Sequence, residues 1–163
     1  MRTWILSLFF VLIYTQAFAV SVVELSPAET RFVAMRADKV HARSGPDKRY
    51  PIEWIYQQQY YPVEIIGEYD QWRKIKDYDG TTTWVRKNLL TNTRYALVIE
   101  PGENNIYEKD NLEADVIARA ENGVIGKIKK CNASFCYLSF NNRIEGWMPR
   151  TVLYGIKKDE EIR

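Results

Sequence analysis

The sequence has few of the residues that carry catalysis or bind transition metals. It contains one histidine, His41, and two cysteines, Cys131 and Cys136. A transition-metal site draws on several histidine, cysteine and carboxylate ligands, and a cysteine nucleophile needs a histidine beside it. Neither a glycine-rich phosphate loop nor a G-x-S-x-G turn is present. The sequence therefore predicts a protein that is not an enzyme and that uses no metal and no cofactor.

A strong net charge is also missing. The formal net charge is +2, and basic and acidic residues are mixed along the chain. Such a surface exerts little long-range pull on nucleic acid or on a charged membrane. We therefore expect no nucleic-acid partner.

Long apolar runs are confined to the start of the chain. Arg2 precedes an apolar run over residues 4–14, and small residues follow at Ala17 and Ala19. The run is well short of the roughly twenty residues that a membrane span needs, and the pattern is typical of a secretory signal peptide. We expect residues 1–19 to be this signal, with an uncleaved anchor as the alternative. The mature chain would have no integral membrane segment and would be periplasmic or secreted.

The two cysteines fit an exported protein, because disulfides persist in oxidising compartments. Their C-x4-C spacing fits neither a zinc half-site nor a redox motif, and a turn begins at Asn132 between them. We expect a disulfide between Cys131 and Cys136 across a hairpin. Two free, buried thiols are the alternative.

The remaining pattern is of short strands that occur twice. Trp72 and Ile75 recur 63 residues later as Phe135 and Leu138, and Trp84 recurs as Trp147. This repetition of core positions indicates an internal duplication. The expected strands cover residues 61–67, 72–76, 81–86, 124–130, 135–140 and 144–148, with closing turns at 88–90 and 151–153. Residues 95–99 are expected to form a strand that packs one copy against the other.

Short motifs in both copies resemble those of bacterial SH3 domains. The first copy has an opening and an ending of this type, at residues 41–46 with 50–51, and at Gly80 with residues 84–85 and 89–90. The second copy keeps the ending at residues 146–148. Its cysteine hairpin resembles that of the second repeat in short exported proteins of Gram-negative bacteria. The resemblance implies an all-β fold of two tandem SH3-like small β-barrels, packed together after the signal peptide. The domains would span residues 30–93 and 94–156, followed by a loose charged tail at 157–163.

Aromatic residues supply the candidate binding surface. Residues 54–61 are rich in rings and amides, which suit contact with a peptide or a glycan. Alternation along a strand would place Trp54 and Tyr56 in the core, but adjacent Tyr60 and Tyr61 cannot both point inward. An aromatic groove is therefore expected from Tyr60, Tyr61, Tyr78 and a half-exposed Trp72. Arg43 is a further binding candidate, although it could instead hydrogen-bond the carbonyl groups of the 44–46 loop.

These observations together favour a non-catalytic binding module of the bacterial cell envelope. Its expected ligand is a peptidoglycan peptide or an envelope protein, as the resemblance implies. The alternative is a secreted protein that binds a host or partner protein through an exposed strand edge.

Overall fold

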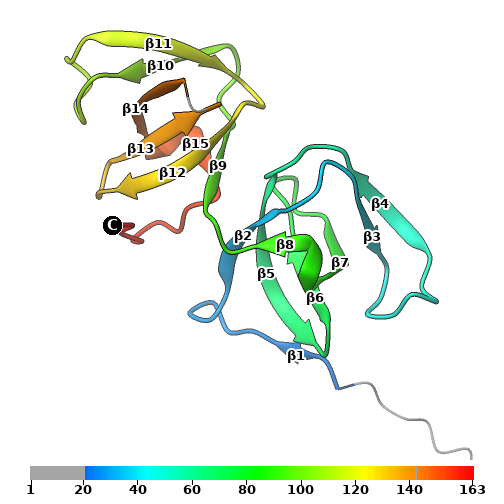
Figure 1. The fold of residues 1–163 in the computed structure, drawn as a ribbon. Coiled ribbons are helices and arrows are strands. Elements are labelled where there is room, and N and C mark those ends of the chain that lie inside the picture. The colour runs from blue at the N-terminus through cyan, green and yellow to red at the C-terminus, as the bar shows by residue number, and fades with distance from the viewer. Residues whose placement is uncertain (1–20, 142) are drawn as a thin grey trace, which may run out of the picture.

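The computed structural model describes residues 21–141 and 143–163, so the predicted signal peptide lies outside the described residues. The chain is nearly all β, as predicted: its strands form an eight-stranded and a seven-stranded sheet (Figure 1). The helices of the described part are two single 3₁₀ turns, η1 (Lys87–Leu89) and η2 (Arg150–Val152). No helix among these residues is long and apolar enough to cross a membrane.

The first barrel is built on the order β4-β3-β7-β6-β5-β2-β8, with β1 added beside β5. Its central strand β6 buries Trp72 and Ile75 and leaves its basic side chains partly exposed, and the Asp-Gly turn at Gly80 leads into β7. The strands are β1 (Val23–Glu24), β2 (Arg31–Met35), β3 (Val40–Arg43), β4 (Ile52–Tyr56), β5 (Pro62–Tyr69), β6 (Trp72–Lys76), β7 (Thr82–Arg86) and β8 (Leu90–Thr91).

The second barrel repeats this order as β11-β10-β14-β13-β12-β9-β15. The strands are β9 (Tyr95–Val98), β10 (Glu103–Tyr107), β11 (Val116–Glu121), β12 (Ile125–Cys131), β13 (Phe135–Phe140), β14 (Ile144–Pro149) and β15 (Leu153–Tyr154). The disulfide between Cys131 and Cys136 is present, as predicted, and joins the two strands of the β12–β13 hairpin.

An offset of 63 residues relates the two barrels over most of the chain. The short helices, for example, begin at Lys87 and Arg150. In the hairpins β3–β4 and β10–β11 the offset is 64, because Arg43 pairs with Trp84 as Tyr107 pairs with Trp147. The boundary near residue 30 stays a prediction, although β1 lies ahead of it and pairs with β5.

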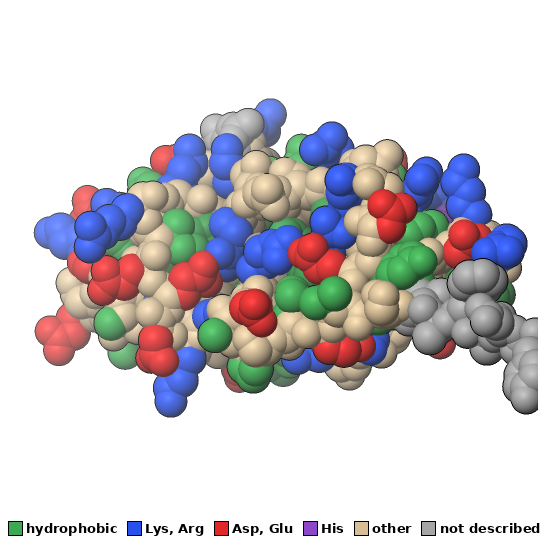
Figure 2. Space-filling model, turned by 90° about the horizontal axis from the view of Figure 1, so that it is seen from below, with side chains coloured by type: hydrophobic (Ala, Val, Ile, Leu, Met, Phe, Trp, Pro, Cys, Tyr) green, Lys and Arg blue, Asp and Glu red, His purple; other side chains and the backbone are tan. Residues whose placement is uncertain are grey.

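Each barrel has its own apolar core. Ile75 and its counterpart Leu138 are both fully buried at the centre of their clusters. Trp84 is buried as expected of a core residue. Outside the cores, basic and acidic side chains are interspersed with apolar ones on the face drawn in Figure 2. This mixture agrees with the low net charge of the sequence.

The barrels contact each other through aromatic rings. Tyr60 stacks on Tyr95 of β9, with ring centroids 4.3 Å apart. Tyr154 of β15 lies edge-on to Phe32 and to Tyr78, and its hydroxyl donates to the Lys76 carbonyl at 3.2 Å. Residues 95–99 thus supply a strand at the contact, as predicted, and that strand belongs to the second sheet.

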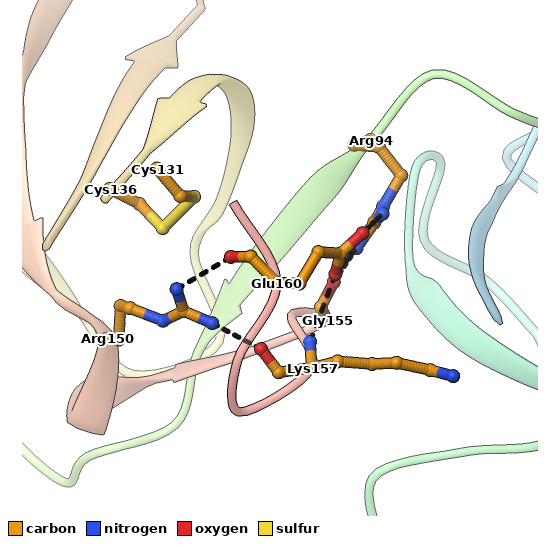
Figure 3. A network of polar contacts seen from close by, with 7 residues as sticks. All are labelled: Arg94, Cys131, Cys136, Arg150, Gly155, Lys157 and Glu160. Carbon is orange, nitrogen blue, oxygen red and sulfur yellow. Dashed lines mark hydrogen bonds and ion pairs between the residues drawn. A yellow bond between two sulfur atoms is a disulfide. The ribbon is translucent and has the colours of Figure 1, made fainter. Parts of the chain in front are cut away.

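The C-terminal segment differs from the expected loose tail, because it is bound to the second barrel (Figure 3). Glu160 forms an ion pair with Arg94, and the Arg150 guanidinium donates to the carbonyl groups of Lys157 and Glu160. Ile162 pairs with Cys131 in a β-bridge. The charges that suggested a solvated tail therefore meet partners that lie far away in the sequence.

Acid is expected to release this segment. Burial raises the pKa of Glu160, but hydrogen bonds from Arg94 and the Lys157 amide outweigh it, so the net pKa is lowered. A carboxyl whose pKa is lower in the folded state stabilises fully above its unfolded value, near 4.3, and loses that contribution as pH falls through the folded value. Amide hydrogen exchange at Ile162 should therefore accelerate below about pH 4. In Glu160→Gln the exchange should already be faster at neutral pH, and persistence of the acid step there would contradict the assignment.

Candidate functional site

A hollow of about 510 Å³ opens beside strand β4 of the first barrel. It lies between that strand, the segment that follows it and the β6–β7 turn. Its lining combines rings, amides and carboxylates: Trp54, Ile55, Tyr56, Gln57, Gln58, Tyr61, Asp77 and Asp79. Most of the residues 54–61 singled out in the sequence therefore meet at one site.

The apolar wall of the hollow is exposed because β4 is an edge strand. It pairs with β3 alone, so one row of its backbone groups has no strand partner. The side chains of Trp54 and Ile55 are 52% and 40% exposed. The expectation that Trp54 fills the core is therefore wrong, whereas Tyr56 is buried as expected. An edge strand contacts the core over only part of its length, and here the contact is at its Tyr56 end.

The polar wall is fixed by Asp77. This side chain is buried, and its carboxylate accepts hydrogen bonds from the Tyr56 hydroxyl at 3.0 Å and the Thr81 amide at 2.8 Å. Asp79 is exposed two residues further along the same turn. The first carboxylate is held rigidly by the turn, and the second stands at the rim. A cationic group would be stabilised between them.

The tyrosines of the hollow remain neutral hydrogen-bonding groups. Burial raises the pKa of Tyr61 to about 12, and the negative charges of Asp77 and Asp79 act in the same direction. Burial likewise raises the pKa of Tyr56. The two rings lie 5.7 Å apart between centroids. Together with Trp54 they offer aromatic faces of the kind that attract a cation or an alkyl chain.

The four predicted aromatic residues do not form one groove. Tyr61 lines the hollow, but Tyr60 and Tyr78 pack against Tyr95 and Tyr154 of the second barrel. Tyr60 has a φ of 65°, which places it in a turn and not in a strand. Tyr60 and Tyr61 therefore do not both point inward from one strand, as expected. Tyr61 lines the hollow, whereas Tyr60 contacts the second barrel.

Trp72 is a correction to the sequence prediction. It is only 6% exposed, on the central strand β6, and the Arg86 guanidinium covers its ring at 5.7 Å. Trp72 therefore packs in the fold and contributes nothing to the hollow.

Arg43 stabilises the loop that follows it in the sequence. Its Nη1 donates to the Tyr50 carbonyl oxygen at 2.6 Å, so it bonds a loop carbonyl as the sequence suggested. Gly45 is required for lack of space and not for its backbone angle, because its φ is not positive. A Cβ at that position would lie 2.5 Å from Cδ1 of Tyr50, so the glycine makes room for the tyrosine ring. The R-S-G-P…Y-P motif is thus a self-contained structural unit.

Two functional candidates were missed in the sequence. Trp54 was taken for a core residue, and Asp77 was not singled out. The signal for Asp77 was its place four residues before Thr81 in a tight hairpin turn, where its carboxylate can cap the turn. The second barrel lacks this set, because Ala120, Val124 and Phe140 stand where the first has Tyr56, Tyr61 and Asp77.

Comparison with known proteins agrees with the motifs of the first barrel. Residues 36–92 match the family described as the bacterial SH3 domain. No curated protein matches the chain. Two solved structures, NlpC1 and NlpC2 from Trichomonas vaginalis, align with 80% and 79% of the chain at 16% and 17% identity, with TM-scores of 0.35 and 0.36.

The chain spans about half of each of these structures, 48% and 49% of their lengths, and TM-scores this low carry no argument about fold or activity. The family match and the disulfide are compatible with a binding module outside the cytoplasm. Residues 36–92 thus match the bacterial SH3 domain, and a second barrel with the same strand order follows them.

Proposed function

We propose that the protein is an exported, non-catalytic binding module of the bacterial cell envelope, and that its hollow beside β4 recognises peptidoglycan peptides. The observation that carries the proposal is an exposed aromatic wall facing two carboxylates, one of them fixed by hydrogen bonds. A short peptide with an amino group and small apolar side chains offers the complementary chemistry. The rings would contact its alkyl surface, and Asp77 and Asp79 would stabilise its ammonium group.

Binding to purified sacculi tests this proposal. We expect the protein to be retained, and we expect Trp54→Ala and Tyr61→Ala each to weaken retention about tenfold or more, as truncation of a central aromatic contact does. Leu112→Ala is a matched control, because Leu112 is a 66% exposed apolar side chain on the second barrel. Retention that the Trp54 and Tyr61 variants leave unchanged would exclude the hollow. Release of soluble fragments from the sacculi would contradict a non-catalytic role.

A second candidate function rests on the free edge of β4. An extended segment of a partner protein could pair with this edge and place a side chain in the hollow. Absence of retention on sacculi, together with protein found in the medium, would favour this secreted, partner-binding function. A proline at Ile55 should then abolish partner binding if the amide of Ile55 is one of those that point away from β3.

A further inference from the structure

A second hollow of the first barrel is basic and shares no lining residue with the hollow beside β4. It has a volume of about 430 Å³ and lies between β2, β5, β6 and the η1–β8 segment. Its polar lining consists of Arg31, Arg36, Arg73, Lys87, Asn88, Thr91 and Asn92. Four cationic side chains thus converge on one concave surface of a chain whose net charge is only +2.

Among the described residues, a single carboxylate pairs with these four cations, so most of the positive charge is not neutralised. Glu68 pairs with Arg31 at 2.7 Å and with Arg73 at 3.3 Å. Within residues 21–141 and 143–163, Arg36 and Lys87 form no ion pair. The hollow therefore keeps two unpaired cations beside two that already hold one carboxylate.

In the second barrel, the position equivalent to this basic hollow is occupied by the C-terminal segment. At the offset of 63, Arg94 stands for Arg31 and Arg150 stands for Lys87. There the C-terminal segment is bound: Nη2 of Arg94 lies 2.9 Å from Oε2 of Glu160, and Nη1 of Arg150 donates to the Glu160 carbonyl at 2.7 Å (Figure 3). One arginine thus binds an acidic side chain, while the other binds backbone carbonyl groups of the same segment.

The disulfide explains why the two barrels differ here. Glu68 and Arg73 face each other across β5 and β6, and Cys131 and Cys136 occupy the same register across β12 and β13. The disulfide of the second barrel therefore stands in place of the Glu68–Arg73 ion pair. The second barrel has no counterpart of Glu68 to pair with Arg94. Arg94 takes its carboxylate from Glu160 instead. In the first barrel Glu68 is retained, and no segment of the described chain supplies the additional acidic group.

We propose that the basic hollow of the first barrel binds an acidic polypeptide segment, in the way that the second barrel binds its own residues 157–162. Arg36 and Lys87 would bind its carboxylate and carbonyl oxygens, and Asn88 and Asn92 would supply further hydrogen bonds. A polypeptide is favoured over a phosphate polymer because the occupant of the equivalent site is a peptide held by its backbone as well as by its charge. This inference is independent of the ligand proposed for the hollow beside β4.

Titration of the protein with a labelled peptide of the sequence DEEI, copied from residues 159–162 and carrying three acidic and no basic side chains, tests the proposal. We expect saturable binding, measured by fluorescence anisotropy. The double variant Arg36→Glu, Lys87→Glu should weaken it at least about tenfold, because hydrogen bonds to charged groups contribute more than neutral ones. The double variant Lys48→Glu, Arg49→Glu is the matched control. It changes the net charge equally on an exposed loop and should alter binding less than about threefold.

The chemistry of the occupant is tested by two further probes. The peptide with its Asp and Glu residues replaced by Asn and Gln should not bind. Equal binding of that amide peptide, or equal sensitivity of the two double variants, would overturn the proposal. Polyphosphate that binds more tightly than the acidic peptide, with the same dependence on Arg36 and Lys87, would assign the site to a phosphate polymer and overturn the polypeptide assignment. Trp54→Ala should leave peptide binding at this hollow unchanged, which separates it from the proposed function.

Discussion

Replacement of Gly155 by alanine is expected to lower the free energy of unfolding by about 3 kcal/mol or more, since backbone strain contributes about 1–2 kcal/mol and overpacking about 1–3 kcal/mol. Gly155 follows β15 with a φ of 109°, a conformation that alanine resists. A Cβ would also lie 2.6 Å from the Tyr95 carbonyl oxygen and 3.1 Å from Cβ of Pro62 in the first barrel. The backbone of β9 cannot move without disturbing the sheet, so the clash has no inexpensive relief.

Gly102→Ala separates the two causes. Gly102 has a φ of 80°, and a Cβ there would meet nothing within 4 Å. Its replacement should therefore show only the backbone strain, about 1–2 kcal/mol. Urea unfolding of both variants measures the difference. Equal losses would mean that the contact with Tyr95 and Pro62 is not tight, and that the barrels are coupled less closely than the structure shows.

Replacement of Asp77 by alanine is expected to cost about 3 kcal/mol of stability, because hydrogen bonds to a charged group are worth about 1.5–3 kcal/mol each. The change removes the acceptor of both the Tyr56 hydroxyl and the Thr81 amide. The Tyr56 hydroxyl would be left buried without this partner, and the β6–β7 turn would lose its cap. Thermal unfolding followed by circular dichroism measures the loss.

The variant Asp79→Ala tests the role of the second carboxylate in binding, separately from stability. Asp79 is exposed, and surface substitutions of this kind change stability by less than about 0.5 kcal/mol. If the hollow binds a cationic group, this variant should fold normally and still weaken retention on sacculi several-fold. A folded Asp79→Ala protein with unchanged retention would show that the rim carboxylate does not contact the ligand. An Asp77→Ala protein of normal stability would contradict the turn geometry.

Local chemistry explains which features the sequence predicted. Strand alternation and the Asp-Gly turn are properties of neighbouring residues, so β6, β7 and their counterparts β13 and β14 were placed within one residue. The offset of 63 followed from apolar residues at equal spacing. The disulfide followed from a short spacing in an exported chain. The SH3-like motifs then gave the fold, which the family match confirms for residues 36–92.

Exposure of individual aromatic residues could not be predicted in this way. Trp54 and Trp72 both stand in alternating strand patterns, and the sequence treated the first as core and the second as half-exposed. The reverse holds, because β4 is an edge strand and β6 is paired on both sides. Strand order is set by contacts between residues far apart in the chain, which no local pattern contains.

The sequence by itself determined strands β5 to β7, β9 and β12 to β14, the duplication, the disulfide and the aromatic segment from which the first hollow is built. Only the tertiary structure decided which rings face solvent, that Tyr60 and Tyr78 join the barrels, and that residues 157–162 are bound. The physical reason is that these outcomes depend on distant partners. Glu160 is fixed by Arg94, and the hollow of Arg36 and Lys87 exists because β2 and η1 meet across the barrel.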